Sequence, residues 1–267
     1  MKVSLIDHTG SGWPDPARRA AALLVFTKST RLQMKPSLLD EIMTWPPEKM
    51  EEELSYMANT IPSSWEFCSY TFLIEGVTRA FTHQLVRTRT ASFAQQTMRV
   101  LDVSEGPGWD YATGPTIPSI PNSDASYDNL TSHQEECMSI YHGNMKDTAI
   151  DYKRLIANGA AIEDARGILP TNILTNIVMK INLRNWVDMI RKRSSSRTQG
   201  EYRDVLEAMK EAVLEVHPWA ILFIDRTADR AIADLEKFLK EWQETGDITP
   251  MQKNTAVKLL DQLRAQS

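Results

Sequence analysis

Hydrophobic and polar positions follow two different periods along the chain, and they predict both strands and helices. Val3 to Ile6 alternates with the two-residue period of a short strand. The segment 66–74 (EFCSYTFLI) is aromatic and β-branched, which favours a second strand. Gly200 to Val216 repeats its apolar side chains at helical intervals. The chain therefore combines strands with helices.

Further segments carry helical spacing or the signals that start and stop helices. Asp15 followed by Pro16 is a capping carboxylate before a proline at the first helical position. Gly159 and Pro170 are stop signals, and the pattern of the segment that follows Pro170 breaks near Asn182. The helices predicted in this way are Ala17–Phe26, Ser37–Thr44, Pro47–Met57, Thr78–Arg89, His133–Asn158, Ala161–Leu169, Thr171–Arg193, and a C-terminal pair over 231–242 and 252–265.

The segment 102–132 interrupts this periodicity with four prolines and three glycines. A loop of this length inside a compact domain is either a lid over a site or a disordered segment. We favour a loop over a site.

Composition and cysteine usage indicate an ordinary globular protein of the cytoplasm. Of the 267 residues, 42% are hydrophobic and 24% charged. No apolar run approaches the ~20 residues that a membrane span needs, and no signal peptide is visible, so we expect no membrane association. Cys68 and Cys137 lie far apart and form no CxxC pair, which predicts neither a disulfide framework nor a zinc site.

Two basic segments stand out because the net charge of the whole chain is −5. Residues 76–101 hold four arginines and no acid, and residues 180–203 hold seven basic residues against two acids. Arginine suits phosphate because its planar guanidinium donates paired hydrogen bonds and stays charged when desolvated. The alternative is that both segments are solvated helix faces.

Several other kinds of site are excluded by the motifs that the sequence lacks. It has no GxGxxG after a strand and no GxxxxGK[ST], hence neither the dinucleotide fingerprint nor the P-loop. Its five histidines show no metal-binding spacing, so we expect no metal.

The two basic segments resemble the signature regions of the flavin-dependent thymidylate synthases. That family carries Arg-His-Arg, then seven residues, then Ser and a further Arg two positions on; here Arg87-Thr88-Arg89 is followed by Thr97-Met98-Arg99. Downstream, the sequence resembles AR-x-x-LP at 165–170, N-x-R at 182–184 and A-Q-x-E-I at 198–202. The order and spacing of these elements make the resemblance specific over about 66–218.

The sequence departs from the family pattern at several neutral or acidic positions while it keeps the arginines. Thr88 replaces the motif histidine, Thr97 the serine, Ala94-Gln95 an Asn-Glu pair, and Val100 a tyrosine. This pattern suggests that phosphate and flavin binding are kept, while base recognition or flavin chemistry is altered.

The resemblance implies a fold, an activity and a set of cofactors. It implies an α+β domain over 1–225, with a central, mostly antiparallel sheet flanked by helices, and an extra C-terminal helical extension over 226–267. It also implies FAD-dependent transfer of a one-carbon unit from methylenetetrahydrofolate to C5 of a pyrimidine deoxynucleoside monophosphate, dUMP to dTMP, with NADPH as reductant. We expect a homotetramer with sites shared between subunits and no nucleic-acid partner.

Residue roles follow from the same resemblance. The catalytic residue would be Arg193, which would stabilise charge on the pyrimidine. The residues expected to bind substrate are Gln84, Arg87, Gln95, Gln96, Thr97, Arg99, Arg166 and Arg193. The residues expected to bind FAD are Glu66, Arg87, Thr88, Arg89, Thr90, Gln95, Asn182, Arg184, Asp188 and Arg197. We expect the arginines of these sets to converge on a shared pocket.

Three alternatives stay open. The changes at Thr88 and Gln95 are compatible with the same chemistry on dCMP, or with a 5-hydroxymethyl product, because an amide and a carboxylate accept different base edges. The missing histidine is compatible with a flavin- and nucleotide-binding protein that has lost catalysis. A nucleic-acid-binding protein is the third, and the negative net charge argues against it.

Overall fold

The computed structural model describes residues 1–29, 34–100, 132–193, 198, 200–224 and 254, and these residues form two compact units. The first unit comprises 1–12 and 68–216, and the second 13–67 and 217–267. Within the described residues, no helix is long and apolar enough to cross a membrane. The predicted helices over 231–242 and 252–265 and the predicted loop over 102–132 lie outside the described residues, apart from Asn254 and from Ser132, which begins α5.

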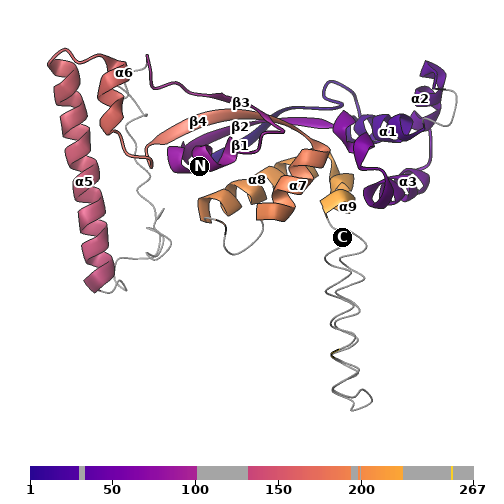
Figure 1. The fold of residues 1–267 in the computed structure, drawn as a ribbon. Coiled ribbons are helices and arrows are strands. Elements are labelled where there is room, and N and C mark those ends of the chain that lie inside the picture. Colours follow the sequence, from indigo (N-terminus) through magenta and orange to yellow (C-terminus); the bar gives the residue numbers. More distant parts are fainter. Residues whose placement is uncertain (30–33, 101–131, 194–197, 199, 225–253, 255–267) are drawn as a thin grey trace. The chain divides into compact units, whose positions relative to one another are not determined.

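The first unit is built on a four-stranded antiparallel sheet in the order β1-β2-β4-β3 (Figure 1). Its strands are β1 (Lys2–His8), β2 (Ser69–Thr78), β3 (Ser92–Gln95) and β4 (Leu174–Asn182). Its helices are α4 (Arg79–Leu85), α5 (Ser132–Ala157), α6 (Ile162–Ala165), the 3-10 helix η4 (Arg166–Ile168), α7 (Leu183–Arg193) and α8 (Gly200–Val216). The expected α+β class, with an antiparallel sheet and surrounding helices, is confirmed.

The sheet buries one face because its side chains alternate. In β2 every second residue from Tyr70 to Ile74 is buried, as are Val77 and Thr78 after the bulge, and in β4 every second residue from Thr175 to Ile181 is buried. α8 packs against β1 and β2 with an apolar stripe that includes Val205, Met209 and Val213. The core of the first unit therefore lies between this face of the sheet and its helices.

A bulge in β2 changes the register halfway along the sheet. Pairing with β4 shifts between Ile74 and Val77, and Gly76 there has a φ of +64°. Glycine adopts this left-handed conformation without the steric cost that a Cβ atom brings. The Gly76 amide donates to Asn176 Oδ1 at 2.9 Å, so the bulge is fixed to the neighbouring strand.

The second unit is helical. It contains α1 (Pro16–Lys28), α2 (Pro36–Met43), α3 (Pro47–Thr60), η1 (Pro62–Phe67), η5 (Pro218–Ala220) and α9 (Ile221–Ile224). Asp15 accepts a hydrogen bond from the Arg18 amide at 2.9 Å, as the capping signal predicted. Trp65 meets Phe223 edge to face at 4.9 Å and donates from Nε1 to the Met57 carbonyl, so the two sequence segments of this unit share a core.

Four of the sequence predictions about elements were wrong in detail. The strand predicted over 66–74 begins at Ser69 and runs to Thr78, because residues 62–67 form η1. The helix predicted over 78–89 ends at Leu85. The helix predicted over 161–169 is α6 followed by the 3-10 turn η4. Residues 174–182 form the strand β4 and only 183–193 are helical, while β3 was not predicted at all.

The β4 segment was predicted wrongly because its hydrophobic period fits both a helix and a strand. The sequence 174–182 is LTNIVMKIN, and its apolar residues fit a helix stripe as well as an alternating strand. Pairing with β2 on one side and β3 on the other decides in favour of the strand. The predicted break near Asn182 is confirmed as the junction of β4 and α7.

Glu201 joins the beginning of α8 to the end of β2. Its two carboxylate oxygens accept hydrogen bonds from the Thr78 amide at 2.7 Å and from the Thr78 hydroxyl at 2.6 Å. The same hydroxyl oxygen accepts from the Phe81 amide at 3.0 Å and caps α4. One carboxylate therefore fixes three elements.

We expect Glu201→Ala to destabilise the protein by about 2 to 3 kcal/mol, because it removes two part-buried hydrogen bonds to a charged group. Urea unfolding at fixed protein concentration measures this. Glu207→Ala on the same helix is the matched control, since Glu207 forms a mostly exposed ion pair with Lys210, worth at most about 1 kcal/mol. Equal losses for the two variants would contradict the role of Glu201.

Candidate active site

A cavity of about 290 Å³ lies between α7 and the turn that follows α4, and it gathers residues from both basic segments. We name it the α7 cavity. Four of its residues come from the turn, Arg87, Thr88, Arg89 and Thr90, and five from α7, Asn185, Asp188, Met189, Lys192 and Arg193. Four cations therefore face one carboxylate across a small space. Such an excess of positive charge suits an anionic ligand.

Local hydrogen bonds hold the two walls of the α7 cavity in place. Asn182 at the end of β4 accepts from the Asn185 amide at 2.9 Å and thereby caps α7. Asn185 in turn donates from Nδ2 to the Thr90 carbonyl at 3.3 Å, which ties α7 to the turn. Trp186 and Val187 face the core, and this leaves the charged side of α7 to the cavity.

A second cavity of about 500 Å³ lies at the segment before β4, and we name it the Arg166 cavity. Its lining residues are Arg79, His83, Met98, Glu163, Arg166, Gly167, Leu169, Pro170 and Thr171. Burial and then the nearby charge of Arg166 lower the pKa of Arg79. Two guanidinium groups thus lie close enough to repel each other. A bound anion would relieve that repulsion.

Glu163 is the one carboxylate of the Arg166 cavity, and it already has partners. Its Oε2 accepts from Arg99 Nε at 2.8 Å, and its backbone carbonyl accepts from Arg166 Nε at 3.1 Å. The Arg99 side chain is 68% exposed in this pair. Arg99 and Arg166 are therefore brought together through Glu163.

Strand pairing places the beginnings of α4 and α7 at opposite ends of β4. Arg79 and Ala80 donate backbone hydrogen bonds to the Ile173 and Thr171 carbonyls, so α4 begins beside the segment that precedes β4. α7 begins at the other end of β4. Nine residues of strand place these ends roughly 25 Å apart. Within one chain, the expected convergence on a single pocket is therefore not seen: the arginines divide between two cavities.

The predicted site residues are placed as follows. Those that line the α7 cavity are Arg87, Thr88, Arg89, Thr90, Asp188 and Arg193. Arg166 lines the Arg166 cavity, and Arg99 is bonded to Glu163 there. Asn182 caps α7, and Arg184 lies in its first turn. Gln84 lies in α4, Glu66 lies in η1 of the second unit, and Arg197 lies outside the described residues.

The β3 region carries the other three. Gln95 donates from Nε2 to Thr82 Oγ1 at 3.0 Å, so its amide is engaged inside the sheet layer. Gln96 is exposed and pairs through its backbone amide with the Asn176 carbonyl at 2.9 Å. Thr97 is exposed, and its hydroxyl accepts from the Arg99 amide at 3.1 Å.

Sequence reasoning missed part of the lining of each cavity. Asn185, Met189 and Lys192 share a helix face with Asp188, at spacings of three and four residues. This spacing is present in the sequence. It identifies a shared helix face once the helix is known to begin at Leu183. Arg79, His83, Met98 and Glu163 come together only through the pairing of strands.

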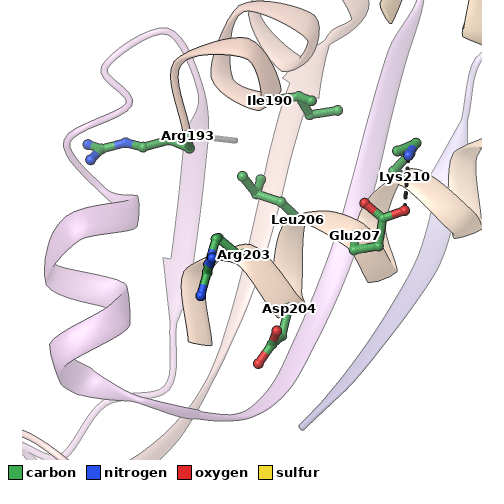
Figure 2. Close-up of a pocket in the computed structure, with 7 residues that line it drawn as sticks. All are labelled: Ile190, Arg193, Arg203, Asp204, Leu206, Glu207 and Lys210. Carbon is green, nitrogen blue, oxygen red and sulfur yellow. Dashed lines mark hydrogen bonds and ion pairs between the residues drawn. The ribbon is translucent and has the colours of Figure 1, made fainter. Parts of the chain in front are cut away.

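Arg193 also borders a third cavity, of about 350 Å³, along α8. Figure 2 shows its lining: Arg203, Asp204, Leu206, Glu207 and Lys210 from α8, with Ile190 and Arg193 from α7. The Arg193 side chain extends away from the other six residues (Figure 2). Its guanidinium carbon lies 5.2 Å from the centre of the Tyr202 ring. The charge of Arg193 therefore does not face the other six residues of this third cavity.

The comparisons with known proteins show the family of the chain. The family model described as thymidylate synthase complementing protein matches residues 4–219. The chain belongs to this family. It is 29% identical over 234 residues to the flavin-dependent thymidylate synthase of Clostridium tetani, with 82% of this chain and 84% of that protein covered. It is 30% identical over 218 residues to that of Geobacter sulfurreducens, with the same coverage.

A solved structure has the same fold. The crystal structure of the UMP/dUMP methylase PolB from Streptomyces cacaoi, bound with 5-Br dUMP, matches with a TM-score of 0.66 over 83% of this chain and 94% of that one, at 19% identity. The family resemblance drawn from the sequence is thus confirmed, and with it the assignment to an enzyme family.

Neither cysteine lines any of these three cavities. Cys68 is buried, and burial raises its pKa to about 12, against smaller opposing effects of hydrogen bonds from Tyr70 and Thr9. A thiol with that pKa stays protonated at neutral pH and is a poor nucleophile. Cys137 is exposed on α5.

We expect a thiol reagent such as dithionitrobenzoate to titrate one thiol in the native protein and two after denaturation. Cys137 is accessible, whereas Cys68 is buried and protonated. Cys137→Ser should leave native protein that does not react within minutes. Rapid reaction of this variant at pH 8 would show that Cys68 is more open than the structure has it.

Proposed function

We propose that this protein transfers a one-carbon unit from methylenetetrahydrofolate to C5 of dUMP, with FAD as redox cofactor, to give dTMP. Membership of the thymidylate synthase complementing protein family supports the reaction class. The observation that carries the proposal is the α7 cavity, in which the Arg87–Thr90 turn meets Arg193 although the two are far apart in sequence.

The residues of the α7 cavity fit a dinucleotide cofactor. The family uses FAD, NADPH as reductant and methylenetetrahydrofolate as carbon donor. Arg87, Arg89 and Lys192 supply charge for a pyrophosphate, and Thr88 and Thr90 supply hydroxyl donors. Asp188 can accept hydrogen bonds from sugar hydroxyls. When bound, the flavin would supply the reducing equivalents that leave a methyl group on the pyrimidine.

The Arg166 cavity fits the phosphate of a nucleoside monophosphate. Arg79 and Arg166 repel each other there, and the single carboxylate, that of Glu163, pairs with Arg99, while Arg166 donates to the Glu163 backbone carbonyl. A phosphate has the charge and the oxygen atoms to satisfy such a group. Gln84, Gln96 and Thr97 remain predicted nucleotide contacts on the basis of the family motif.

We further propose that complete sites form between subunits of a homotetramer. Within one chain the predicted arginines divide between the two cavities, so a site that uses both sets needs a second subunit. The Arg166 cavity of one subunit would then face the α7 cavity of another.

Cytoplasmic location stays a prediction from the sequence.

Arg193 would act on the pyrimidine ring by its charge. Attack by C5 on the one-carbon unit moves electron density onto the ring carbonyl groups, and a guanidinium beside them stabilises that density. One preorganised contact of this kind is worth about 3 to 4 kcal/mol. With Cys68 buried and protonated, activation of C5 would depend on this charge and not on addition of a protein thiol.

The wild-type protein should purify yellow and release tritium from [5-³H]dUMP when it is given methylenetetrahydrofolate and NADPH. The assay is run in parallel with UMP and dCMP, and the product mass is measured. Release from dCMP alone would move the substrate to cytosine, and a heavier product would indicate a hydroxymethyl group. A yellow protein without turnover on any of the three would indicate a binding protein without catalysis.

Arg193→Ala should lower kcat by about 10²- to 10³-fold and keep the flavin, because it removes charge stabilisation and leaves the other cations of the α7 cavity. Tritium release and the visible spectrum are measured together. Arg203→Ala, an exposed arginine of α8, is the control and should behave as wild type. A folded but colourless Arg193→Ala protein would mean that Arg193 holds the flavin.

Arg166→Ala should raise KM for dUMP roughly 10- to 100-fold, since a charged hydrogen-bond donor to phosphate is lost. Steady-state kinetics at saturating folate measure the change. Arg154→Ala is the control, because it removes the same charge at another place. Arg154 is exposed on α5, where its side chain pairs with Asp151. A KM that stays at the wild-type value in Arg166→Ala would remove the Arg166 cavity from the nucleotide site.

A further inference from the structure

Tyr202 lies directly behind the α7 cavity and has a fixed ring. It is the third residue of α8, and its side chain is fully buried. The ring packs edge-on against Phe81 of α4, with 5.1 Å between the ring centres. Phe81 is itself fully buried. Packing on this scale leaves the ring little room to move.

The hydroxyl group at the end of this ring lacks a well-directed partner in the part of the chain that the structure describes. It is buried, and no atom of the described residues forms a well-directed hydrogen bond with it. Burial raises the pKa of Tyr202, while the approach of Thr88 and Arg193 to the hydroxyl acts in the opposite direction. Buried hydroxyl groups are nearly always hydrogen-bonded. The position of the Tyr202 hydroxyl, close to two possible partners but not well directed toward either, therefore needs an explanation.

Both groups that approach the hydroxyl belong to the α7 cavity. Arg193 places its guanidinium carbon 5.2 Å from the centre of the Tyr202 ring, within the range of a cation–π interaction. Thr88 lies with its hydroxyl 3.8 Å from the Met189 sulfur, and all three of Thr88, Met189 and Arg193 line the cavity. Tyr202 therefore supports the wall that carries the proposed catalytic arginine.

The sequence departs from the family motifs at both members of this contact. Thr88 stands where the motif has histidine, and Tyr202 stands where A-Q-x-E-I has isoleucine. The side chain at position 88 is smaller than in the motif, and the side chain at 202 is larger and carries a hydroxyl. Positions 88 and 202 are in contact, and their side chains change in volume in opposite directions. This indicates that the change at one position compensates for the change at the other.

We propose that Tyr202 is a positioning residue that holds the guanidinium of Arg193 at the α7 cavity, and that it does so as a pair with Thr88. The face of the ring restrains the cation, and the hydroxyl, which Arg193 and Thr88 approach, directs it. This inference rests on the proposed function, because it assigns to Arg193 a task on the pyrimidine.

Tyr202→Phe tests the hydroxyl alone, since it keeps the ring that contacts Phe81 and Arg193. We expect kcat for tritium release from [5-³H]dUMP to fall about 10-fold, because a misdirected catalytic group is costly, with KM for dUMP and the flavin content within about twofold of wild type. Thr88→Val should give a similar loss. The double variant Tyr202→Phe/Thr88→Val should be no worse than the poorer single variant.

Tyr152→Phe is the matched control. Tyr152 is also fully buried, lies on α5 and lines none of the three cavities, so this variant should keep the wild-type kcat. Wild-type kcat in Tyr202→Phe, or fully additive losses in the double variant, would overturn the proposal while the proposed function stands. A wild-type protein that releases no tritium would overturn the proposed function and this inference together.

A stability measurement tests the pair without any turnover. Thr88→His alone should lower the melting temperature by about 5 °C, because the larger ring is forced against Tyr202. Adding Tyr202→Ile should recover most of that loss, although Tyr202→Ile alone is destabilising. Melting temperatures that fall additively in the double variant would show that positions 88 and 202 are not coupled.

Discussion

Antiparallel pairing between β2 and β4 is the constraint on which both cavities depend. β2 continues directly into α4 and the Arg87–Thr90 turn, and β4 continues directly into α7. Because the strands run in opposite directions, α4 begins at the end of the sheet opposite to α7. The chain then passes through α4 and the Arg87–Thr90 turn at the α7 cavity and returns in β3 toward Arg99 and Arg166. The pairing of β2 with β4 thus sets the positions of the elements that carry the arginines of both cavities.

This arrangement concentrates positive charge in a protein whose net charge is negative. Four cations share the α7 cavity with Asp188, and the Arg166 cavity sets Arg79 against Arg166. Like charges held together by a rigid sheet are destabilising until an anion binds. The strain is placed where the proposed ligands, a dinucleotide cofactor and a nucleoside monophosphate, carry phosphate. Ligand binding should therefore stabilise the fold as well as start the chemistry.

Several motif residues are engaged in folding and not only in ligand contact. Asn182 caps α7 and Glu201 bonds Thr78, so each sets the position of an element that lines a cavity. Gln95 holds Thr82 of α4 from β3. In this chain, residues of the motif regions therefore stabilise the scaffold as well as line the site. Tyr202, which departs from the motif, is proposed to support Arg193 in a similar way.

The sequence by itself determined the α+β class, the capped helix after Asp15, the helix over 200–216, the family, and the set of arginines. These features depend on local patterns and on spacing, which a single chain displays directly. Only the tertiary structure decided that 174–182 is a strand, that β3 exists, and that Arg79, His83 and Glu163 join Arg166 at a second cavity. Each of these depends on pairing between distant segments, because an apolar run with an ambiguous period takes its conformation from its neighbours. The contact between Thr88 and Tyr202 is of the same kind: both residues are visible in the sequence, but their closeness is set by the packing of α8 against the sheet.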